Sequence, residues 1–374
     1  MREIISVRLA MRQQLKAAQI ERVVVRGANW VGDAVMTVPA LRELRRLLPD
    51  ARITLATRAW AEGIFADADF IDDLLLLDDR RGVRSFLRRV SAWRARRFDL
   101  ALIFPNAFEP AFVAAAARVP LRFGYATDAR ARLLTHALAT PDWRSTRHEV
   151  FYYLYLVAAL EHALTGTQTV TTREPAFALS VSDARRHDAG VLLHGHGVKF
   201  DRPLVALCPG STNSRAKRWP VENYAALADQ LIEAAGAAVV LIGARAELDV
   251  TKQVGAQMRH QPIVLTGATN LAETVAVLSH CNLLVTNDTG PAHIAAALQR
   301  PTLVIFGPTN PLTTRPFAPT AEIIREPPDC APCMLRDCPI DHRCMTAITP
   351  AQVFARAQEL LACVACPMHT EVVG

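Results

Sequence analysis

Short apolar runs alternate with amphipathic helical patterns along the first half of the chain. Strands are expected at 21–26, 53–56, 73–77 and 98–104, and helices at 34–48 and 110–118. In the first of these helices Val35, Val38 and Leu41 share one face, and Pro49 follows its end. Strands that alternate with helices of this length predict a parallel sheet covered on both faces.

The same alternation restarts after residue 200. Strands are expected at 203–207, 238–242, 263–265, 283–286 and 302–306, and helices at 221–235, 271–279, 291–298 and 350–362. The stretch 165–200, rich in Thr, Ser, His and Gly, is interpreted as a linker region. The sequence therefore predicts an α/β protein with an extension at 1–20, Rossmann-like domains at 21–180 and 200–349, and a terminal helix and tail at 350–374. Ligands of such sheets bind beyond the carboxyl ends of the strands, so we expect a central cleft between the two sheets.

Composition narrows the function classes. The chain has 374 residues, of which 51% are hydrophobic, and no apolar run approaches the ~20 residues that span a bilayer. Residues 1–20 lack the apolar core of an export signal, which leaves a poorly ordered extension or a membrane-surface helix and predicts a cytoplasmic protein. The net charge of +6 favours anionic partners. No Lys/Arg run is interleaved with aromatic residues, so nucleic acid is not an expected partner.

A glycine-rich turn at 27–33 follows the first strand and opens the first helix. Its glycines permit a close backbone approach, and a helix amino terminus offers free N–H groups. Asp33 lies in the first helical turn. It is interpreted either as a helix cap or as a general base that takes the proton of an acceptor hydroxyl.

A second loop, at 208–220, again links a strand to a helix. Gly210, Ser211 and Thr212 can present N–H and hydroxyl donors to a diphosphate. Lys217, one of only four lysines in the chain, would neutralise the charge on a departing nucleoside diphosphate. The alternative is a solvated basic loop.

Two further strand ends carry polar groups. Asp288, Thr289 and Gly290 lie where a strand runs into a helix, and His293 follows on that helix. Glu247 follows another strand end and could accept hydrogen bonds from ribose hydroxyls. Because these positions converge on the ligand-binding edge of the second sheet, we interpret them as donor-site candidates.

Several of these segments together resemble the bacterial lipopolysaccharide heptosyltransferases, glycosyltransferase family 9. The matching pieces are 29–33 with Pro39, 217–220, 287–293, 295–297, 300–301 and 306–311, and the similarity extends over about 22–360. The resemblance implies a GT-B fold, an inverting transfer without metal or other cofactor, ADP-heptose as donor, and a heptose on the Kdo–lipid A inner core as acceptor.

The resemblance also implies residue roles. The base falls on Asp33, and the donor-binding positions fall on Ser211, Thr212, Lys217, Glu247, Asp288, Thr289, Gly290 and His293. Because the acceptor is a large anion at the membrane surface, arginines of the first half are candidate contacts: Arg58, Arg122 and Arg144, with Arg130 and Arg147 beside them. We expect a monomer, cytoplasmic or peripheral on the inner membrane.

Six of the eight cysteines lie near the C-terminal end. Cys330, Cys333, Cys338 and Cys344 have a spacing that fits a zinc or iron–sulfur site, reduced structural thiols, or a disulfide or redox role. Cys363 and Cys366 form a weaker pair that a terminal helix could carry.

Two other function classes remain open at this point. One is an enzyme of the same fold that acts on a different nucleotide sugar, either another transferase or an epimerase. The other is a non-catalytic nucleotide-binding protein, against which the presence of Asp33 argues, since binding alone requires no base.

Overall fold

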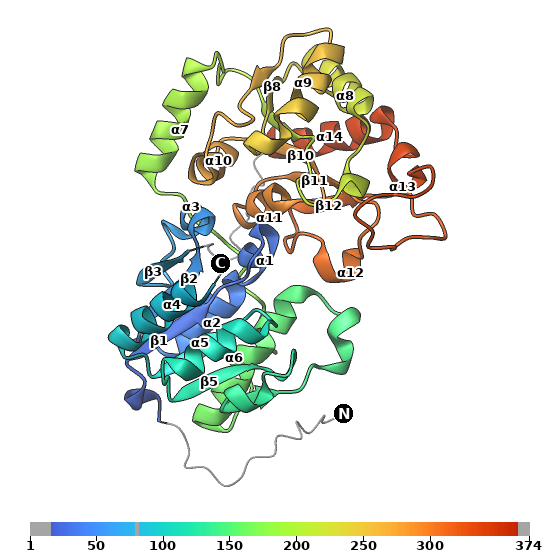
Figure 1. Ribbon diagram of the computed structural model, residues 1–374. Coiled ribbons are helices and arrows are strands. Elements are labelled where there is room, and N and C mark those ends of the chain that lie inside the picture. The colour runs from blue at the N-terminus through green and yellow to red at the C-terminus, as the bar shows by residue number, and fades with distance from the viewer. Residues whose placement is uncertain (1–15, 79–81, 366–374) are drawn as a thin grey trace, which may run out of the picture. The chain divides into compact units, whose positions relative to one another are not determined.

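The computed structural model describes residues 16–78 and 82–365. The chain forms two units, the first comprising residues up to Glu62 with Ala68–Phe177, and the second comprising Gly63–Asp67 with the residues from Ala178 onward. Each unit contains one six-stranded sheet, and every strand pairing in both sheets is parallel. The predicted α/β class with two Rossmann-like halves is therefore confirmed (Figure 1).

The first sheet has the strand order β3-β2-β1-β4-β5-β6. Its strands are β1 (Arg22–Arg26), β2 (Arg52–Arg58), β3 (Asp73–Leu77), β4 (Leu100–Ile103), β5 (Leu121–Tyr125) and β6 (His136–Leu138). Its helices are α1 (Val31–Met36), α2 (Val38–Leu47), α3 (Glu62–Phe65, which crosses into the second unit), α4 (Val83–Arg96), α5 (Phe108–Ala116) and α6 (Glu149–Thr165). The chain moves from β1 to β2 toward one side of the sheet and from β4 to β5 toward the other side. Because both crossovers are right-handed, α2 and α5 cover opposite faces.

The second sheet has the order β12-β11-β10-β7-β8-β9, which repeats the first when counted from β7. Its strands are β7 (Leu204–Cys208), β8 (Ala238–Leu241), β9 (Ile263–Val264), β10 (Leu283–Asn287), β11 (Thr302–Ile305) and β12 (Ala321–Ile324). Its helices are α7 (Asp183–Gly195), α8 (Val221–Glu233), α9 (Leu248–Gln257), α10 (Leu271–Leu278), α11 (Gly290–Ala297), α12 (Pro311–Thr314), α13 (Arg343–Thr346) and α14 (Pro350–Ala365). Helices α8, α9 and α14 contribute to one buried apolar core against this sheet.

The strand order determines where a ligand can bind. In both sheets the chain reverses its direction of travel between two adjacent strands, β1 and β4 in the first and β7 and β10 in the second. At such a point the loops after the two strands diverge and leave a crevice at the carboxyl edge. The predicted loops 27–33, 208–220 and 287–290 all follow these switch-point strands.

Two sequence expectations differ from the structure. The helix predicted at 34–48 is broken at Thr37 into α1 and α2, because Pro39 has no N–H to donate to Val35 and its ring opposes that carbonyl. The stretch 165–200 contains α7, a helix with few buried residues and therefore a weak apolar period. Residues 1–15 of the predicted extension and Cys366 lie outside the described residues.

Candidate active site

The switch point of the second sheet gathers the loops after β7 and β10 around one buried amide. Asn287, the last residue of β10, donates from Nδ2 to the carbonyls of Pro209 (2.9 Å) and Gly210 (3.1 Å). Its Oδ1 accepts from the Trp219 N–H at 3.0 Å and the Tyr224 hydroxyl at 3.1 Å. Asn287 is fully buried, and a buried amide with all its bonds made fixes the geometry around it. Asn287 lies within the family-like segment 287–293, but its role could not be predicted from the sequence.

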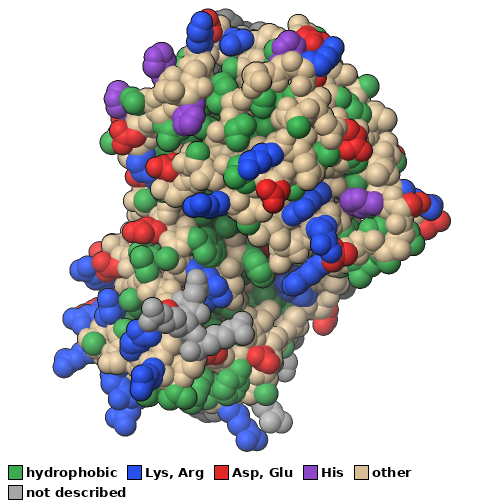
Figure 2. Space-filling model, turned by 45° about the horizontal axis from the view of Figure 1, so that its top comes forward, with side chains coloured by type: hydrophobic (Ala, Val, Ile, Leu, Met, Phe, Trp, Pro, Cys, Tyr) green, Lys and Arg blue, Asp and Glu red, His purple; other side chains and the backbone are tan. Residues whose placement is uncertain are grey.

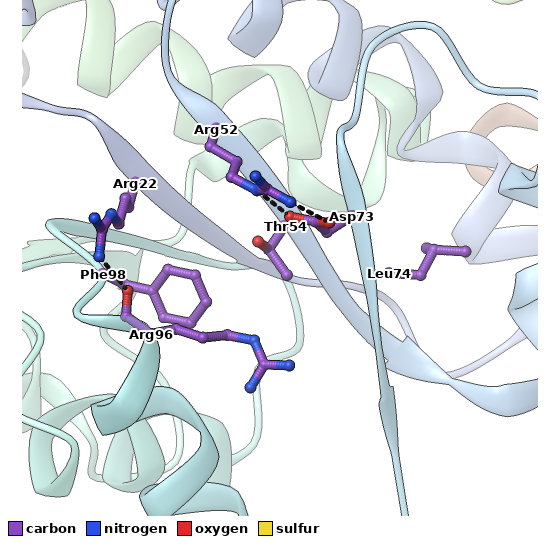
Figure 3. Close-up of a pocket in the computed structure, with 7 residues that line it drawn as sticks. All are labelled: Arg22, Arg52, Thr54, Asp73, Leu74, Arg96 and Phe98. Atoms are coloured by element: carbon purple, nitrogen blue, oxygen red, sulfur yellow. Dashed lines mark hydrogen bonds and ion pairs between the residues drawn. The ribbon is translucent and has the colours of Figure 1, made fainter.

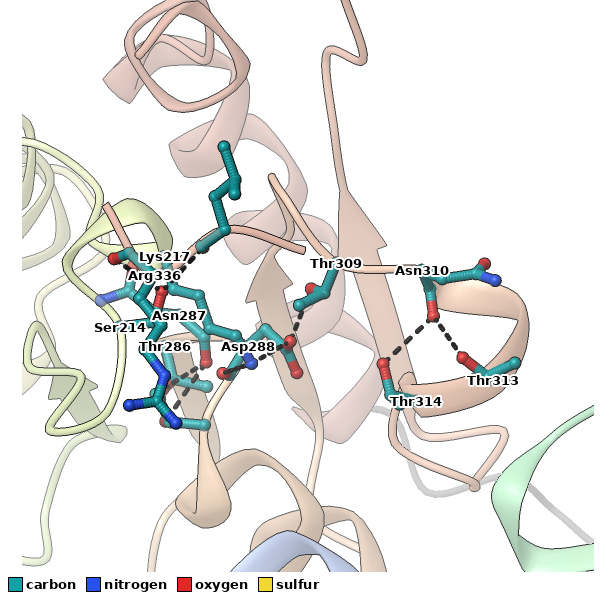
Figure 4. A network of polar contacts seen from close by, with 12 residues as sticks. Ser214, Lys217, Thr286, Asn287, Asp288, Thr309, Asn310, Thr313, Thr314 and Arg336 are labelled. Atoms are coloured by element: carbon teal, nitrogen blue, oxygen red, sulfur yellow. Dashed lines mark hydrogen bonds and ion pairs between the residues drawn. The ribbon is translucent and has the colours of Figure 1, made fainter. Parts of the chain in front are cut away.

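Lys217 and Asp288 form an ion pair between these two loops (Figure 4). The Lys217 Nζ lies 2.8 Å from Asp288 Oδ2 and 3.2 Å from the Asp288 carbonyl oxygen. The Thr309 hydroxyl, from the loop after β11, donates to the same Oδ2 at 2.7 Å. An ammonium group has three donors, and two have partners among the described residues. The third is available to a phosphate oxygen, with the ammonium already held in place by Asp288.

Glu247 holds the glycine loop from its outer side. Its Oε2 accepts from the Ala244 N–H at 2.8 Å and its Oε1 from the Thr212 hydroxyl at 3.1 Å. The carboxylate packs so closely on Gly210 that a Cβ added there would lie 2.3 Å from Glu247 Cδ. Any larger residue at position 210 would displace the Glu247 carboxylate from its bonds to Ala244 and Thr212.

The other donor-site candidates lie on the same edge. Ser211 is buried, and its carbonyl accepts from the Arg218 guanidinium at 3.0 and 3.3 Å. Thr289 is the N-cap residue of α11, with its hydroxyl 3.2 Å from that of Thr286, and Gly290 is the first residue of that helix. His293 is buried one turn into α11. The helix α11 begins three residues after Asn287, whose side chain is bonded to the Gly210 loop, and its amino terminus carries the N–H groups that favour an anion.

The cysteine-rich loop supports the segment that carries Lys217. The Arg336 carbonyl accepts from the Ala216 N–H (2.9 Å) and from the Ser214 hydroxyl (3.2 Å). His342 Nε2 lies 2.7 Å from the Ala216 carbonyl oxygen, and Arg215 pairs with Asp337 at 2.6 Å. These contacts fix the backbone on which the Lys217 side chain is mounted.

The cysteines of that loop are free thiols in the structure. Burial, and after it the nearby Cys338, Cys333 and Cys330, raise the pKa of the Cys344 thiol to about 11. Within 16–78 and 82–365, no three His, Cys, Asp or Glu side chains are grouped so that they could hold a metal ion.

In the first unit the loop after β1 is braced by a buried arginine. Arg26 donates from Nη2 to Asn29 Oδ1 at 2.7 Å and from Nη1 to the Gly27 carbonyl. Gly27 packs against β2, where an added Cβ would lie 3.1 Å from Leu55 Cδ1. Asp33 is in the first turn of α1, half-buried, at the carboxyl edge of the sheet.

A second carboxylate lies near Asp33 and was not found from the sequence. Glu149, the first residue of α6, is buried and pairs with Arg144 through both oxygens, one of them at 2.9 Å. Burial, together with the negative charge of Asp33, raises the pKa of Glu149 to about 7 against the lowering effect of Arg144 and the Tyr153 hydroxyl. A lone Glu before an apolar run was the only sequence signal, and it is equally typical of a helix start.

Replacement of Glu149 by Gln is expected to change the pH dependence of stability. Below pH 4.5 the carboxyl is protonated in both the folded and unfolded chains, whereas between 4.5 and about 7 only the unfolded chain ionises it. Across this window the free energy of unfolding of the wild type therefore falls by up to about 3 kcal/mol, whereas that of Glu149→Gln does not. Urea unfolding at several pH values measures this difference.

Glu161, also buried on α6, supplies the matched control. Hydrogen bonds from Thr169 and Val170 and the charge of Arg46 hold its pKa below the usual value despite burial. Glu161→Gln should therefore show the opposite trend, losing stability relative to wild type as pH rises above the Glu161 pKa. Parallel curves for the two variants would contradict the account of Glu149.

The candidate acceptor arginines are placed differently from one another. Arg58 ends β2 at the carboxyl edge. Arg144 is committed to Glu149 and lies over the Tyr152 ring at 4.1 Å. Arg122, near the start of β5, donates to the carbonyls of Leu133 (2.6 Å) and Val119. Arg122 therefore lies toward the amino edge of the sheet, and its guanidinium is bonded to backbone carbonyls. This placement does not support the predicted contact with the acceptor.

A pocket of about 430 Å³ lies at the amino edge of the first sheet (Figure 3). It is lined by the starts of β1, β2 and β3 and the end of α4, through Arg22, Arg52, Thr54, Asp73, Leu74, Arg96 and Phe98. Arg52 and Asp73 pair across it at 2.9 Å and 2.5 Å. Because ligands of parallel sheets bind at the opposite, carboxyl edge, this pocket is not the candidate active site.

The fold and the strand-end loops define a two-domain α/β class of protein with a candidate ligand site at the carboxyl edge of each sheet. Comparison with known proteins gives the family. Residues 86–343 match the profile of glycosyltransferase family 9 (heptosyltransferase). The chain belongs to this glycosyltransferase family, and the predicted enzyme class is confirmed.

Curated and solved relatives agree with this assignment. The lipooligosaccharide heptosyltransferase 2 of Haemophilus ducreyi is 28% identical over 357 residues, covering 91% of this chain and 100% of the relative. The lipopolysaccharide heptosyltransferase 2 of Escherichia coli is 29% identical, covering 81% and 88%. The solved E. coli ADP-heptose LPS heptosyltransferase II superposes with a TM-score of 0.78 at 27% identity and covers 93% of this chain and 100% of that one. No helix among the described residues is long and apolar enough to cross a membrane.

Proposed function

We propose that this chain transfers a heptose from ADP-heptose to the heptosyl–Kdo–lipid A inner core of lipopolysaccharide, with inversion at the anomeric carbon. The substrates come from the names of the relatives, which are heptosyltransferases 2 of lipopolysaccharide and, in E. coli, an ADP-heptose enzyme. The observation that carries the proposal is the Lys217–Asp288 pair beside the Gly210 loop and the start of α11.

The donor diphosphate binds in the second unit in this account. Backbone N–H groups around Gly210, Ser211 and Gly290 and the third donor of Lys217 bind its oxygens. Thr212 and Thr289 add hydroxyls, while Glu247 holds Thr212 and the glycine turn in place. His293, buried on α11, is the last of the donor-site candidates. As charge grows on the departing ADP, the ammonium and the helix terminus stabilise it without reorganising.

The acceptor reacts at the first unit. Its hydroxyl oxygen forms a bond to the anomeric carbon from the face opposite ADP, the bond from that carbon to the phosphate oxygen breaks, and ADP leaves with the electron pair. Asp33 takes the hydroxyl proton. Arg58, at the carboxyl edge, is the remaining acceptor candidate with a suitable place in the sheet. The enzyme acts as a monomer, peripheral on the cytoplasmic face of the inner membrane.

The proposal predicts acceptor-dependent release of ADP. Purified protein with ADP-heptose and heptosyl–Kdo–lipid A should release ADP and give a product heavier by one heptose in mass spectrometry. The same protein without acceptor should release little. ADP binding without turnover would indicate a non-catalytic nucleotide-binding protein, and turnover of another nucleotide sugar only would reassign the donor.

A further inference from the structure

Arg147 lies in the loop after β6, two residues before the first residue of α6, and therefore at the carboxyl edge of the first sheet. Its half-buried side chain is stacked on two aromatic rings. The guanidinium carbon lies 3.7 Å from the centroid of the Phe151 ring and 5.4 Å from that of the Trp143 ring. Within 16–78 and 82–365 the side chain forms no hydrogen bond and no ion pair, and its nitrogen atoms are not buried. The rings therefore hold a guanidinium whose N–H donors have no partner in this part of the chain.

An exposed arginine alone indicates no site, because Lys and Arg side chains are spread over the face in view in Figure 2. Stacking without a carboxylate is what distinguishes Arg147. Two other arginines of the first unit lie over aromatic rings, and both have an acidic partner. Arg42, 4.7 Å from the centroid of the Phe70 ring, pairs with Asp69 at 3.2 Å, and Arg144 pairs with the glutamate that begins α6. Burial lowers the pKa of Arg147, and no acidic side chain of the described residues counteracts this.

The stacking leaves the edge of the guanidinium available to a ligand. The rings cover the flat faces of this group, whereas its N–H bonds lie in the plane and point outward. A planar fork of this kind matches two oxygens of a carboxylate or a phosphate. Because the rings already fix the side chain, less conformational entropy is lost when an anion binds. Arg147 is therefore a preorganised receptor for an oxyanion.

Arg147 lies at the same edge as Asp33 but not beside it. Helix α6 packs against α1, and the charge of Asp33 raises the pKa of Glu149, so the start of α6 lies close to Asp33. Phe151 follows Glu149 by two residues, about 200° around the helix, so the ring that holds Arg147 is on the other side of α6. An anion bound there belongs to a part of the ligand other than the reacting hydroxyl.

We propose that Arg147 binds an oxyanion of the acceptor, a carboxylate or a phosphate, and thereby selects an anionic acceptor and positions its hydroxyl. The inference rests on the proposed function, in which the reacting heptose is joined to Kdo, a sugar acid, and through it to the phosphates of lipid A. Both kinds of anion lie beyond the reacting sugar. They therefore suit a receptor on the rim of the edge that carries Asp33, while Trp143 and Phe151 fix the guanidinium.

Binding measurements with two acceptors test this role without turnover. The heptosyl–Kdo disaccharide carries the carboxylate and lacks phosphate, whereas heptosyl–Kdo–lipid A in detergent carries both. Calorimetry should give a Kd for Arg147→Gln that is weaker than that of wild type by about tenfold or more, the loss of hydrogen bonds to a charged group. Arg147→Lys keeps the charge but loses the fork, so its Kd should lie between the two. Weakening on both acceptors assigns the carboxylate, and weakening on the lipid A form alone assigns a phosphate.

Arg42→Gln is the matched control, because it removes a ring-stacked arginine of the same unit that already has a carboxylate partner. Its Kd for both acceptors should equal that of wild type. In the transfer assay Arg147→Gln should raise the KM for the acceptor and leave kcat and the Kd for ADP unchanged, since the contact is equally strong in the ground state and the transition state.

Unchanged acceptor affinity in Arg147→Gln, or equal weakening in Arg42→Gln, would overturn the inference. A joint fall of kcat and ADP affinity in Arg147→Gln would also overturn it, because it would indicate a role in the fold. If wild type binds the acceptors through Arg147 but transfers no heptose, the proposed function fails and the anion site stands. If wild type transfers heptose and Arg147→Gln binds the acceptors normally, only the role of Arg147 fails. No binding of either acceptor by wild type would contradict both.

Discussion

Asp33→Asn should reduce kcat by roughly 10²–10⁴-fold, because the acceptor hydroxyl loses the group that takes its proton. The substitution keeps the size and polarity of the side chain in the first turn of α1. Since Asp33 belongs to the first unit and the donor loops to the second, affinity for ADP should not change. Steady-state rates of ADP release with saturating acceptor measure the first effect, and calorimetry measures the second.

Glu109→Gln is the matched control for this prediction. Glu109 is likewise an acid in the first turn of a helix that follows a switch-point strand, here α5 after β4. It should retain near-wild-type kcat on acceptor in detergent. If Asp33→Asn turned over normally, or Glu109→Gln lost as much activity, Asp33 would not be the base.

Lys217→Met should lower kcat by roughly 10²–10³-fold, the usual loss when one preorganised charge stabiliser of the transition state is removed. It should also weaken binding of ADP, since the ammonium donates to the diphosphate in the ground state. The variant leaves the Asp288 carboxylate, only 4% exposed, without its cation. An unpaired buried charge destabilises a fold by several kcal/mol, so stability must be separated from chemistry.

The double variant Lys217→Met with Asp288→Asn makes that separation. It removes both charges, so most of the lost stability should return while the rate stays low. Lys252→Met, at an exposed lysine of α9 in the same unit, should behave as wild type in both respects. Recovery of the rate together with stability in the double variant would show that Lys217 acts on the fold and not on ADP.

Much of the strand framework followed from the sequence because both sheets are parallel and buried. The run Val23–Val25 is apolar throughout, as is typical of a strand covered on both faces, and its partners on β2 are buried as well. The break at Thr37 was missed because the apolar period of α1 continues into α2, and only Pro39 marks it. Helix α6 is buried on most of its sides and has no strong period to detect.

In the candidate site, too, some residues could be predicted from the local sequence pattern and others depend on tertiary packing. Lys217 and Asp288 were both proposed from strand-end positions, and the structure pairs them. Strand ends are readable from local pattern, whereas the role of Asn287 depends on which strands are neighbours. Glu149 reaches the vicinity of Asp33 only through the packing of α6 against α1, which no local spacing encodes. The hydrogen bond from Arg122 to the Leu133 carbonyl could not be predicted from local spacing either.

Calorimetric titration with ADP tests the central claim, that the second unit holds the diphosphate and the first supplies the base. The account predicts binding of one ADP to wild type, the same Kd for Asp33→Asn, and a Kd at least tenfold weaker, about 1.4 kcal/mol, for the Lys217/Asp288 double variant. No ADP binding by wild type, or unchanged affinity in the double variant with loss in Asp33→Asn, would contradict it.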